Sequence, residues 1–152
     1  EKEAVDKVLQ TPSPDSSPRL IKFHSTTKTS LNMLASGKAK AIYSQRDLRD
    51  VAVSLMDFEN SSFDQLVNGR LQGIMTEDAR WKQADSTCHI EYADIMQQPE
   101  QVIQKIAAFL DIEADEETAA RIAAACSIEA TRKHIAAIQQ GEAAHIHTRK
   151  IG

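Results

Sequence analysis

The segment that decides the interpretation of this chain is Tyr43-Ser44-Gln45-Arg46-Asp47-Leu48-Arg49-Asp50-Val51-Ala52-Val53-Ser54. Residues 39–45 predict a strand, and the run from Asp47 to Phe58 predicts a helix, because its apolar residues recur at helical spacing. Arg46 closes the strand, and Ser54 lies on the helix that follows. An arginine fork, a hydroxyl group and the N–H groups of a helix start can together bind one phosphate. A plain strand, turn and capped helix is the alternative.

Strands and helices alternate along the rest of the chain. The predicted strands are 20–24, 39–45 and 87–92, and the predicted helices are 29–35, 47–58, 61–71, 98–110, 115–125 and one that Ser127 caps. This order indicates an α/β fold with a parallel sheet flanked by helices. Such sheets bind ligands at the carboxyl ends of their strands. His24, Arg46 and Tyr92 each end a predicted strand, so we expect them to share one site.

The composition is that of a globular domain. The chain has 152 residues, of which 41% are hydrophobic and 26% charged, and this length is enough for one domain with a real core. Residues 1–18 predict a linker with a short helix in its first ten residues, since 11–18 hold three of the four prolines. Residues 19–152 form the predicted α/β domain. The net charge of −4 argues against a nucleic-acid-binding protein.

Several features point to the cytoplasm. No apolar run approaches the length of a membrane span, and no signal-peptide pattern is present. Cys88 and Cys126 are the two cysteines, and we interpret them as free thiols in a reducing compartment.

His145 and His147 lie two residues apart without a third ligand, so we predict no metal site.

The Arg46 segment resembles the 3′-phosphate-binding segment of the sulfotransferases that use 3′-phosphoadenosine-5′-phosphosulfate. In that family a strand ending in Arg precedes a sequence close to Asn-Pro-Arg-Asp-Val-Ala-Val-Ser. Here Asp47 and Leu48 replace Asn-Pro, whereas Arg46 and Ser54 match. Arg49 and Asp50 also match, and we expect them to form a structural ion pair near the helix start.

Three further segments resemble the same family in the same order, and together they cover residues 19–152. Residues 19–24 resemble a strand that ends in Lys-Thr-His, residues 91–95 with Pro99 resemble a Tyr-Glu-Asp segment and its helix, and residues 147–152 resemble a C-terminal basic loop. The resemblance implies a P-loop-nucleotide-hydrolase-like sulfotransferase fold. It also implies transfer of a sulfonate group to a hydroxyl of a small molecule, without a metal, leaving adenosine 3′,5′-bisphosphate.

The resemblance implies roles for residues near the sulfonate group and near the 3′-phosphate of the sulfonate donor, 3′-phosphoadenosine-5′-phosphosulfate. His24 would act as the general base, since a neutral imidazole near pH 7 suits proton removal from a hydroxyl. Lys22 would offset negative charge near the sulfonate group, and Arg46 with Ser54 would hold the 3′-phosphate. The alternatives are a histidine bonded to the backbone and a lysine whose stem lies along the sheet edge.

The resemblance also implies contacts for residues further along the chain. The ring of Tyr92 would stack on the adenine, or instead close a strand over the core. Ser127 would also lie near the adenine. Arg149 and Lys150 would close over the 3′-phosphate, with Gly152 allowing close backbone approach; a solvated basic tail is the alternative.

One part of the family pattern is missing from the sequence. A loop of the type Pro-Lys-Ser-Gly-Thr-Thr holds the 5′-phosphosulfate in the family, and none of the five glycines here sits in such a loop. Either residues upstream of Glu1 supply it, so that the fold is incomplete at its N-terminus, or the protein lacks half of its donor site. Two functions therefore stay open: a sulfotransferase, or a non-catalytic module that binds adenosine 3′,5′-bisphosphate or a partner.

Overall fold

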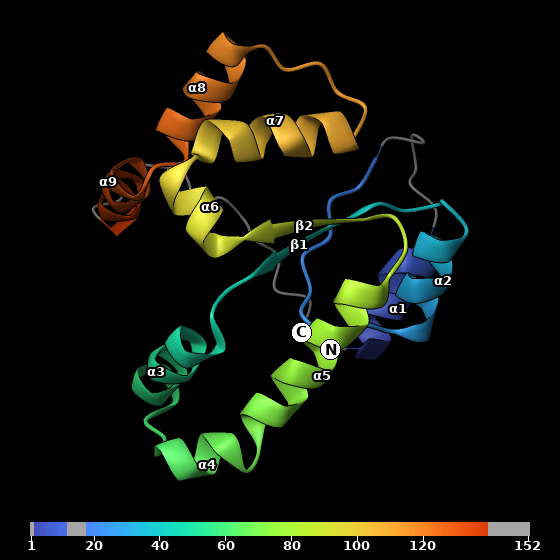
Figure 1. The fold of residues 1–152 in the computed structure, drawn as a ribbon, viewed down its shortest axis with the longest axis vertical. Helices are drawn as coiled ribbons and strands as arrows, with labels where there is room; N and C mark the ends of the chain where they lie inside the picture. The colour runs from blue at the N-terminus through green and yellow to red at the C-terminus, as the bar shows by residue number, and fades with distance from the viewer. Residues whose placement is uncertain (1, 12–17, 140–152) are drawn as a thin grey trace. The chain divides into compact units, whose positions relative to one another are not determined.

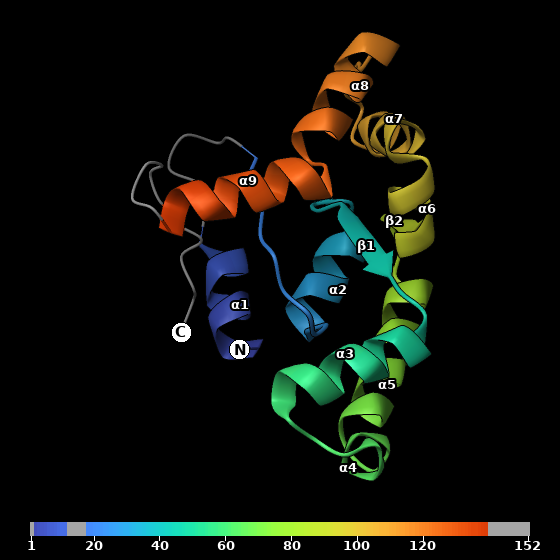
Figure 2. The same cartoon turned by 90° about the vertical axis from the view of Figure 1, so that its left-hand side faces the viewer.

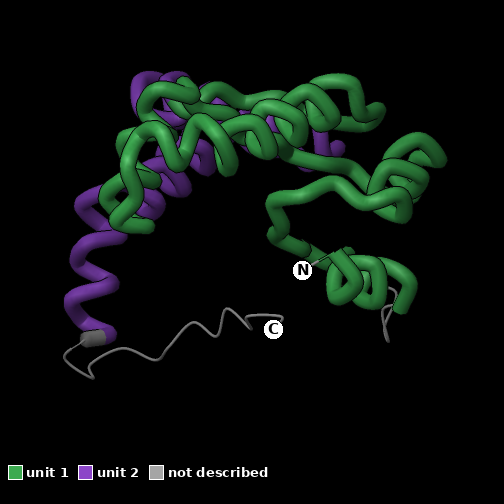
Figure 3. Tube along the Cα trace, turned by 90° about the horizontal axis from the view of Figure 1, so that it is seen from below, with its two compact units in different colours: residues 1–92, 151–152 green, residues 93–150 purple. Residues whose placement is uncertain are grey.

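The computed structural model describes residues 2–11 and 18–139. Its described residues fall into two units, the first ending at Tyr92 and the second beginning at Ala93 (Figure 3). The first unit contains α1 (Lys2–Gln10), α2 (Lys28–Ala35), β1 (Ala41–Gln45), α3 (Leu48–Glu59), α4 (Phe63–Val67), α5 (Arg70–Gln83) and β2 (Thr87–Glu91) (Figure 1). Helix α6 (Tyr92–Gln97) leads into the second unit, which continues with α7 (Pro99–Phe109), α8 (Glu116–Ala125) and α9 (Ile128–Gln139).

Strands β1 and β2 form a parallel pair in the first unit. The register aligns Ala41 with Thr87 and Gln45 with Glu91. A parallel pair needs a crossover connection, and α3, α4 and α5 supply it. The structure therefore confirms the predicted α/β fold with a small parallel sheet flanked by helices.

The strand predicted at residues 20–24 is wrong. The segment has no regular secondary structure, and no strand of the described residues pairs with it. Side chains hold it instead. Arg19 donates to the carbonyl oxygens of Val8, at 2.9 Å, and of Thr11 at the end of α1, and the ring of Phe23 packs against Trp81 at 5.7 Å between centroids.

The core of the crossover lies where α3, α4 and α5 meet. Ala52, Leu66 and Leu71 are buried there, and Leu48, Leu55, Met56 and Ile74 pack around them. Figures 1 and 2 show α4 at the turn between α3 and α5. Phe58, near the end of α3, is 87% exposed. Helix α3 ends at Glu59, and its C-cap Asn60 is in the left-handed conformation with φ of 51°.

The single helix predicted over residues 61–71 is two helices. Ser62 and Gln65 form a capping box that starts α4, and α4 ends at Val67, with the Asn68 amide donating back to the carbonyl oxygen of Asp64. Helix α5 then begins at Arg70 and ends at Gln83, so most of it lies where the sequence analysis predicts no helix or strand.

The other helix ends carry residues that commonly begin or end helices. Gly37, with φ of 68°, follows α2, and Pro99 is in the first turn of α7. Ser127 caps α9, since its Oγ accepts the N–H of Ala130 at 3.1 Å. In the second unit α7 packs against α8, burying Val102, Ala107 and Ala119.

Glu77 of α5 anchors the segment that carries His24. Its Oε2 accepts both the backbone N–H and the hydroxyl of Thr26, each at 2.7 Å, and Oε1 pairs with Arg80 at 2.9 Å and Lys2 at 3.4 Å. Burial raises the pKa of Glu77, but the bonds from Thr26 and the charge of Lys2 outweigh it and leave the pKa below its usual value. The ionised carboxylate therefore favours the folded state.

We predict that Glu77→Ala lowers the free energy of unfolding by about 1–3 kcal/mol, because it leaves the donors of buried Thr26 without a partner. Urea unfolding at neutral pH measures this loss. Glu77→Gln keeps an acceptor and should lose less. The pKa of Glu77 is lower in the folded than in the unfolded chain. The parent should therefore have a larger free energy of unfolding than Glu77→Gln above the unfolded pKa of about 4, and this difference should disappear as pH falls through the folded pKa.

Gln72→Ala, at an exposed position of the same helix, is the matched control and should change stability by less than about 0.5 kcal/mol. A loss for Glu77→Ala no larger than that of the control would contradict the anchoring role.

Candidate functional site

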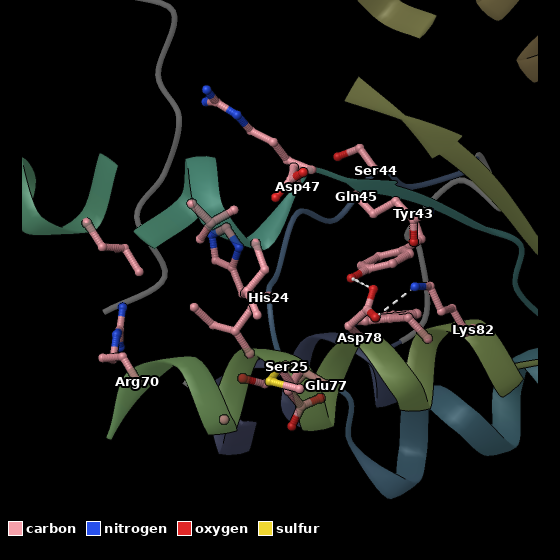
Figure 4. Close-up of a pocket in the computed structure, with 18 of the residues that line it drawn as sticks. His24, Ser25, Tyr43, Ser44, Gln45, Asp47, Arg70, Glu77, Asp78 and Lys82 are labelled. Atoms are coloured by element: carbon pink, nitrogen blue, oxygen red, sulfur yellow. Dashed lines mark hydrogen bonds and ion pairs between the residues drawn. The ribbon is translucent and has the colours of Figure 1, made fainter. Parts of the chain in front are cut away.

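An open pocket of about 1190 Å³ lies in the first unit. His24 and Ser25, the carboxyl end of β1, the start of α3, and α5 line it (Figure 4). Two helices and the end of a parallel strand thus enclose the place where an α/β fold binds ligands.

The structure brings two of the predicted site residues into this pocket and sets a third beside them. His24 and Arg46 both line it. The guanidinium carbon of Arg46 lies 4.8 Å from the ring centroid of Tyr92, which is within the range of a cation–π interaction. The register explains this contact. Gln45, the last residue of β1, pairs with Glu91, the last residue of β2, so Arg46 and Tyr92 follow directly after paired residues.

The other predicted site residues lie elsewhere. Lys22 and Ser54 have exposed side chains and are outside the set of residues that line the pocket. Ser127 lies in the second unit as the exposed N-cap of α9. Arg149, Lys150 and Gly152 lie outside the described residues.

Two arginines at the start of α3 have different partners. Nε of Arg46 lies 3.4 Å from Asp50, one helical turn on. Arg49 pairs instead with Asp47, at 2.6 Å between Nη2 and Oδ2, and its N–H also donates to Asp47. The hydrogen bonds from the Arg49 side chain and backbone lower the pKa of Asp47 to about 2. The expected Arg49–Asp50 pair is therefore wrong, because Asp47 caps the helix and lies closer to Arg49.

A hydrogen-bonded group from β1 and α5 forms another part of the pocket. The hydroxyl of Tyr43 donates to Asp78 at 2.9 Å, and Lys82 pairs with the same carboxylate at 2.9 Å (Figure 4). Burial raises the pKa of Tyr43, and the bond to Asp78 with the negative charges of Glu77 and Glu91 raises it further. The phenol therefore stays protonated and acts as a donor.

Aromatic contacts hold this group rigidly. The ring of Tyr43 stacks on Trp81 at 5.7 Å and 15° between ring planes, and its other neighbour is His89, edge-on at 5.9 Å. Trp81 is buried. Burying these rings gives β1 and α5 a fixed spacing, so the polar tips of Tyr43 and Asp78 meet in one position.

The sequence interpretation missed the contribution of α5 to the pocket. The sequence analysis predicts no helix or strand between residues 71 and 87, yet Glu77, Asp78, Trp81 and Lys82 from that segment line the pocket. Pairs of opposite charge one turn apart, such as Asp78 with Lys82, are a signal that predicts helix here. Only the folded chain brings this helix to the end of β1.

No helix within residues 2–11 and 18–139 is both long and apolar enough to cross a membrane. Within the same residues, no group of three or more His, Cys, Asp or Glu side chains is arranged to hold a metal ion.

We predict that Tyr43 stays protonated at about pH 11, above the ordinary tyrosine pKa of about 10. Its raised pKa means that the stabilising contribution of Tyr43 is present below the unfolded pKa and is lost as pH rises through the folded pKa. Ultraviolet absorbance at the tyrosinate band between about pH 7 and pH 11 measures the ionisation.

The chain has two tyrosines, so Tyr43→Phe tests the assignment directly. The folded variant should show the same absorbance change as the folded parent, whereas the unfolded variant should show a smaller change than the unfolded parent. A smaller change in the folded variant would refute the protonated phenol.

The chain was compared with models of known protein families. The model of the sulfotransferase domain matches residues 2–150. The comparison with curated proteins gives no match. The matched range takes in the segment around Arg46 and the segment that carries His24, and the observed parallel sheet flanked by helices agrees with the family's fold. The chain therefore belongs to the sulfotransferase domain family.

Proposed function

We propose that this domain transfers a sulfonate group from 3′-phosphoadenosine-5′-phosphosulfate to a hydroxyl group of a small-molecule acceptor. Family membership supports sulfonate transfer in general. The observation that carries the finer proposal is that His24 and Arg46, from different segments of the chain, line one pocket. Sulfonate transfer needs both a base for the acceptor hydroxyl and an anchor for the donor, held at a fixed separation.

Arg46 is the proposed anchor for the 3′-phosphate. Its pair with Asp50 uses Nε, so the two terminal nitrogens keep parallel N–H donors that suit a phosphate. Asp50 and Ser54 are four residues apart on α3 and share one side of the helix. The Ser54 hydroxyl is therefore on the side of α3 toward which Arg46 extends, which supports its assignment to the same phosphate.

Tyr92 is the proposed partner of the adenine. Its ring is already in contact with Arg46, so a nucleotide held by Arg46 would bring its base within reach of an exposed aromatic face. For Ser127, Arg149, Lys150 and Gly152 the proposal rests on the family resemblance alone. The donor, when bound, supplies the sulfonate group and the phosphate that leaves.

His24 is the proposed general base. Its imidazole lines the pocket, and Glu77 anchors the neighbouring Thr26 to α5. These two hydrogen bonds restrain the backbone next to His24, which favours a fixed position for the base. The imidazole would take the proton of the acceptor hydroxyl, and Lys22, two residues earlier, would offset negative charge at the transferred group.

A non-catalytic module that binds adenosine 3′,5′-bisphosphate is the second candidate. The sequence of residues 1–152 carries no glycine-containing loop of the type that holds the 5′-phosphosulfate in the family. Such a module would keep the Arg46 anchor without transferring a sulfonate group. Binding and transfer therefore have to be measured separately.

We predict that Arg46→Ala weakens the binding of adenosine 3′,5′-bisphosphate by roughly 10- to 100-fold, since a charge-assisted bond to an ionic group contributes about 1.5–3 kcal/mol. Calorimetric titration of the parent and the variant measures the change. Arg49→Ala removes the same charge from a side chain that is 90% exposed and bound to Asp47. It should change the affinity by less than about threefold. Equal losses in both variants would indicate a general effect of charge and rule out an anchor at Arg46.

We predict that His24→Ala lowers kcat for sulfonate transfer by about 10²- to 10⁴-fold, because the acceptor hydroxyl loses its base. The affinity for adenosine 3′,5′-bisphosphate should stay within about twofold, since the anchor remains. His134→Ala, in the second unit, is the control. Unchanged kcat in His24→Ala would exclude the base. A parent that binds the bisphosphate but transfers no sulfonate group would favour the non-catalytic module.

A further inference from the structure

Besides the polar group of Tyr43 and Asp78, the pocket lining includes a set of apolar side chains, which we call its apolar wall. Val51 and Leu55 contribute to it from α3, and Ile74 and Met75 contribute from α5. Leu55 and Ile74 also pack against the buried core of the crossover, so this wall is supported from behind. Apolar side chains that line a pocket bind the apolar body of a ligand.

Gly73 lies in the same wall, in the interior of α5. Glycine is unfavourable in a helix interior relative to alanine. Neither a left-handed φ nor a close contact requires it, because Gly73 is absent from the described positive-φ residues and a Cβ atom built on it would meet no described atom within 4 Å apart from its chain neighbours and the backbone of its own helix. The glycine therefore leaves open space in the pocket.

The charged side chains around this space already have partners. Arg70 pairs with Glu59 at 3.1 Å, and Lys82 pairs with Asp78 at 2.9 Å. Glu91 accepts a hydrogen bond from Gln45. A charged ligand at the wall would have to compete with these pairs or lose its own hydration, and an uncharged one would not.

We propose that Gly73 determines the size of the acceptor and that the acceptor is an uncharged alcohol or phenol with an apolar body. The body would lie along the wall formed by Val51, Leu55, Ile74 and Met75, over Gly73, with its hydroxyl toward His24. This inference rests on the proposed function, because it assigns the acceptor part of the same pocket. A side chain at position 73 would occupy the space that a large acceptor needs, and a small acceptor would still fit.

The test measures binding without requiring sulfonate transfer. Phenol, 2-naphthol and the anionic 6-hydroxy-2-naphthoate are titrated calorimetrically into the full chain in the presence of adenosine 3′,5′-bisphosphate. The parent should bind 2-naphthol about tenfold or more tightly than the anionic analogue, because the carboxylate would be desolvated at the wall. Failure of the parent to bind 2-naphthol, or tighter binding of the naphthoate, would overturn the proposal.

Gly73→Leu should weaken 2-naphthol binding by about tenfold or more and phenol binding by less than about threefold, since pocket space discriminates by size. Gln72→Leu adds the same side chain at the neighbouring exposed position, outside the pocket, and should leave both affinities within about twofold. Gly73→Ala should give a smaller loss for 2-naphthol in the same direction. Equal effects on the two phenols, or no effect in either Gly73 variant, would overturn the proposal.

Circular dichroism melting checks that the variants fold. Alanine and leucine have higher helix propensity than glycine, so both Gly73 variants should melt at or above the temperature of the parent. Transfer of a sulfonate group to 2-naphthol is assayed separately. Size-dependent binding without transfer would leave the size role of Gly73 standing and would count against the proposed function alone.

Discussion

The site depends on the parallel register of β1 and β2. Pairing of Gln45 with Glu91 makes Arg46 and Tyr92 neighbours where the two strands end, and their contact at 4.8 Å follows from that alignment. A slip of one residue would turn Tyr43 and Arg46 to the opposite faces of the sheet. The register thus determines both the position of Arg46 at the strand end and its contact with the ring of Tyr92.

Helix α5 turns this strand end into a pocket. Through Glu77 it holds the segment of His24, through Asp78 it binds Tyr43, and through Trp81 it packs on the aromatic rings of both segments. Three side chains within two turns of one helix therefore position a loop and a strand. Ionisation reinforces this arrangement, because the same contacts depress the pKa of Glu77 and raise that of Tyr43.

The pocket divides into parts of different chemistry. Arg46 offers a cation directly before α3. The wall near Gly73 offers apolar surface and open space, and His24 lies in the same pocket. The proposed transfer from an anionic donor to a less polar acceptor would use such a division, because a single environment would not favour both.

The sequence by itself determined the features that depend on neighbouring residues. Helical spacing and capping residues predicted α2, α3, α7, α8 and α9, and the motif around Arg46 indicated the family and the strand that carries it. Only the tertiary structure decided which segments meet. It left residues 20–24 without a strand partner, paired Asp50 with Arg46, and brought α5 with Gly73 and Asp78 to the pocket. Local patterns cannot determine these outcomes, because each depends on a contact between residues far apart in the chain or on the choice between competing charges.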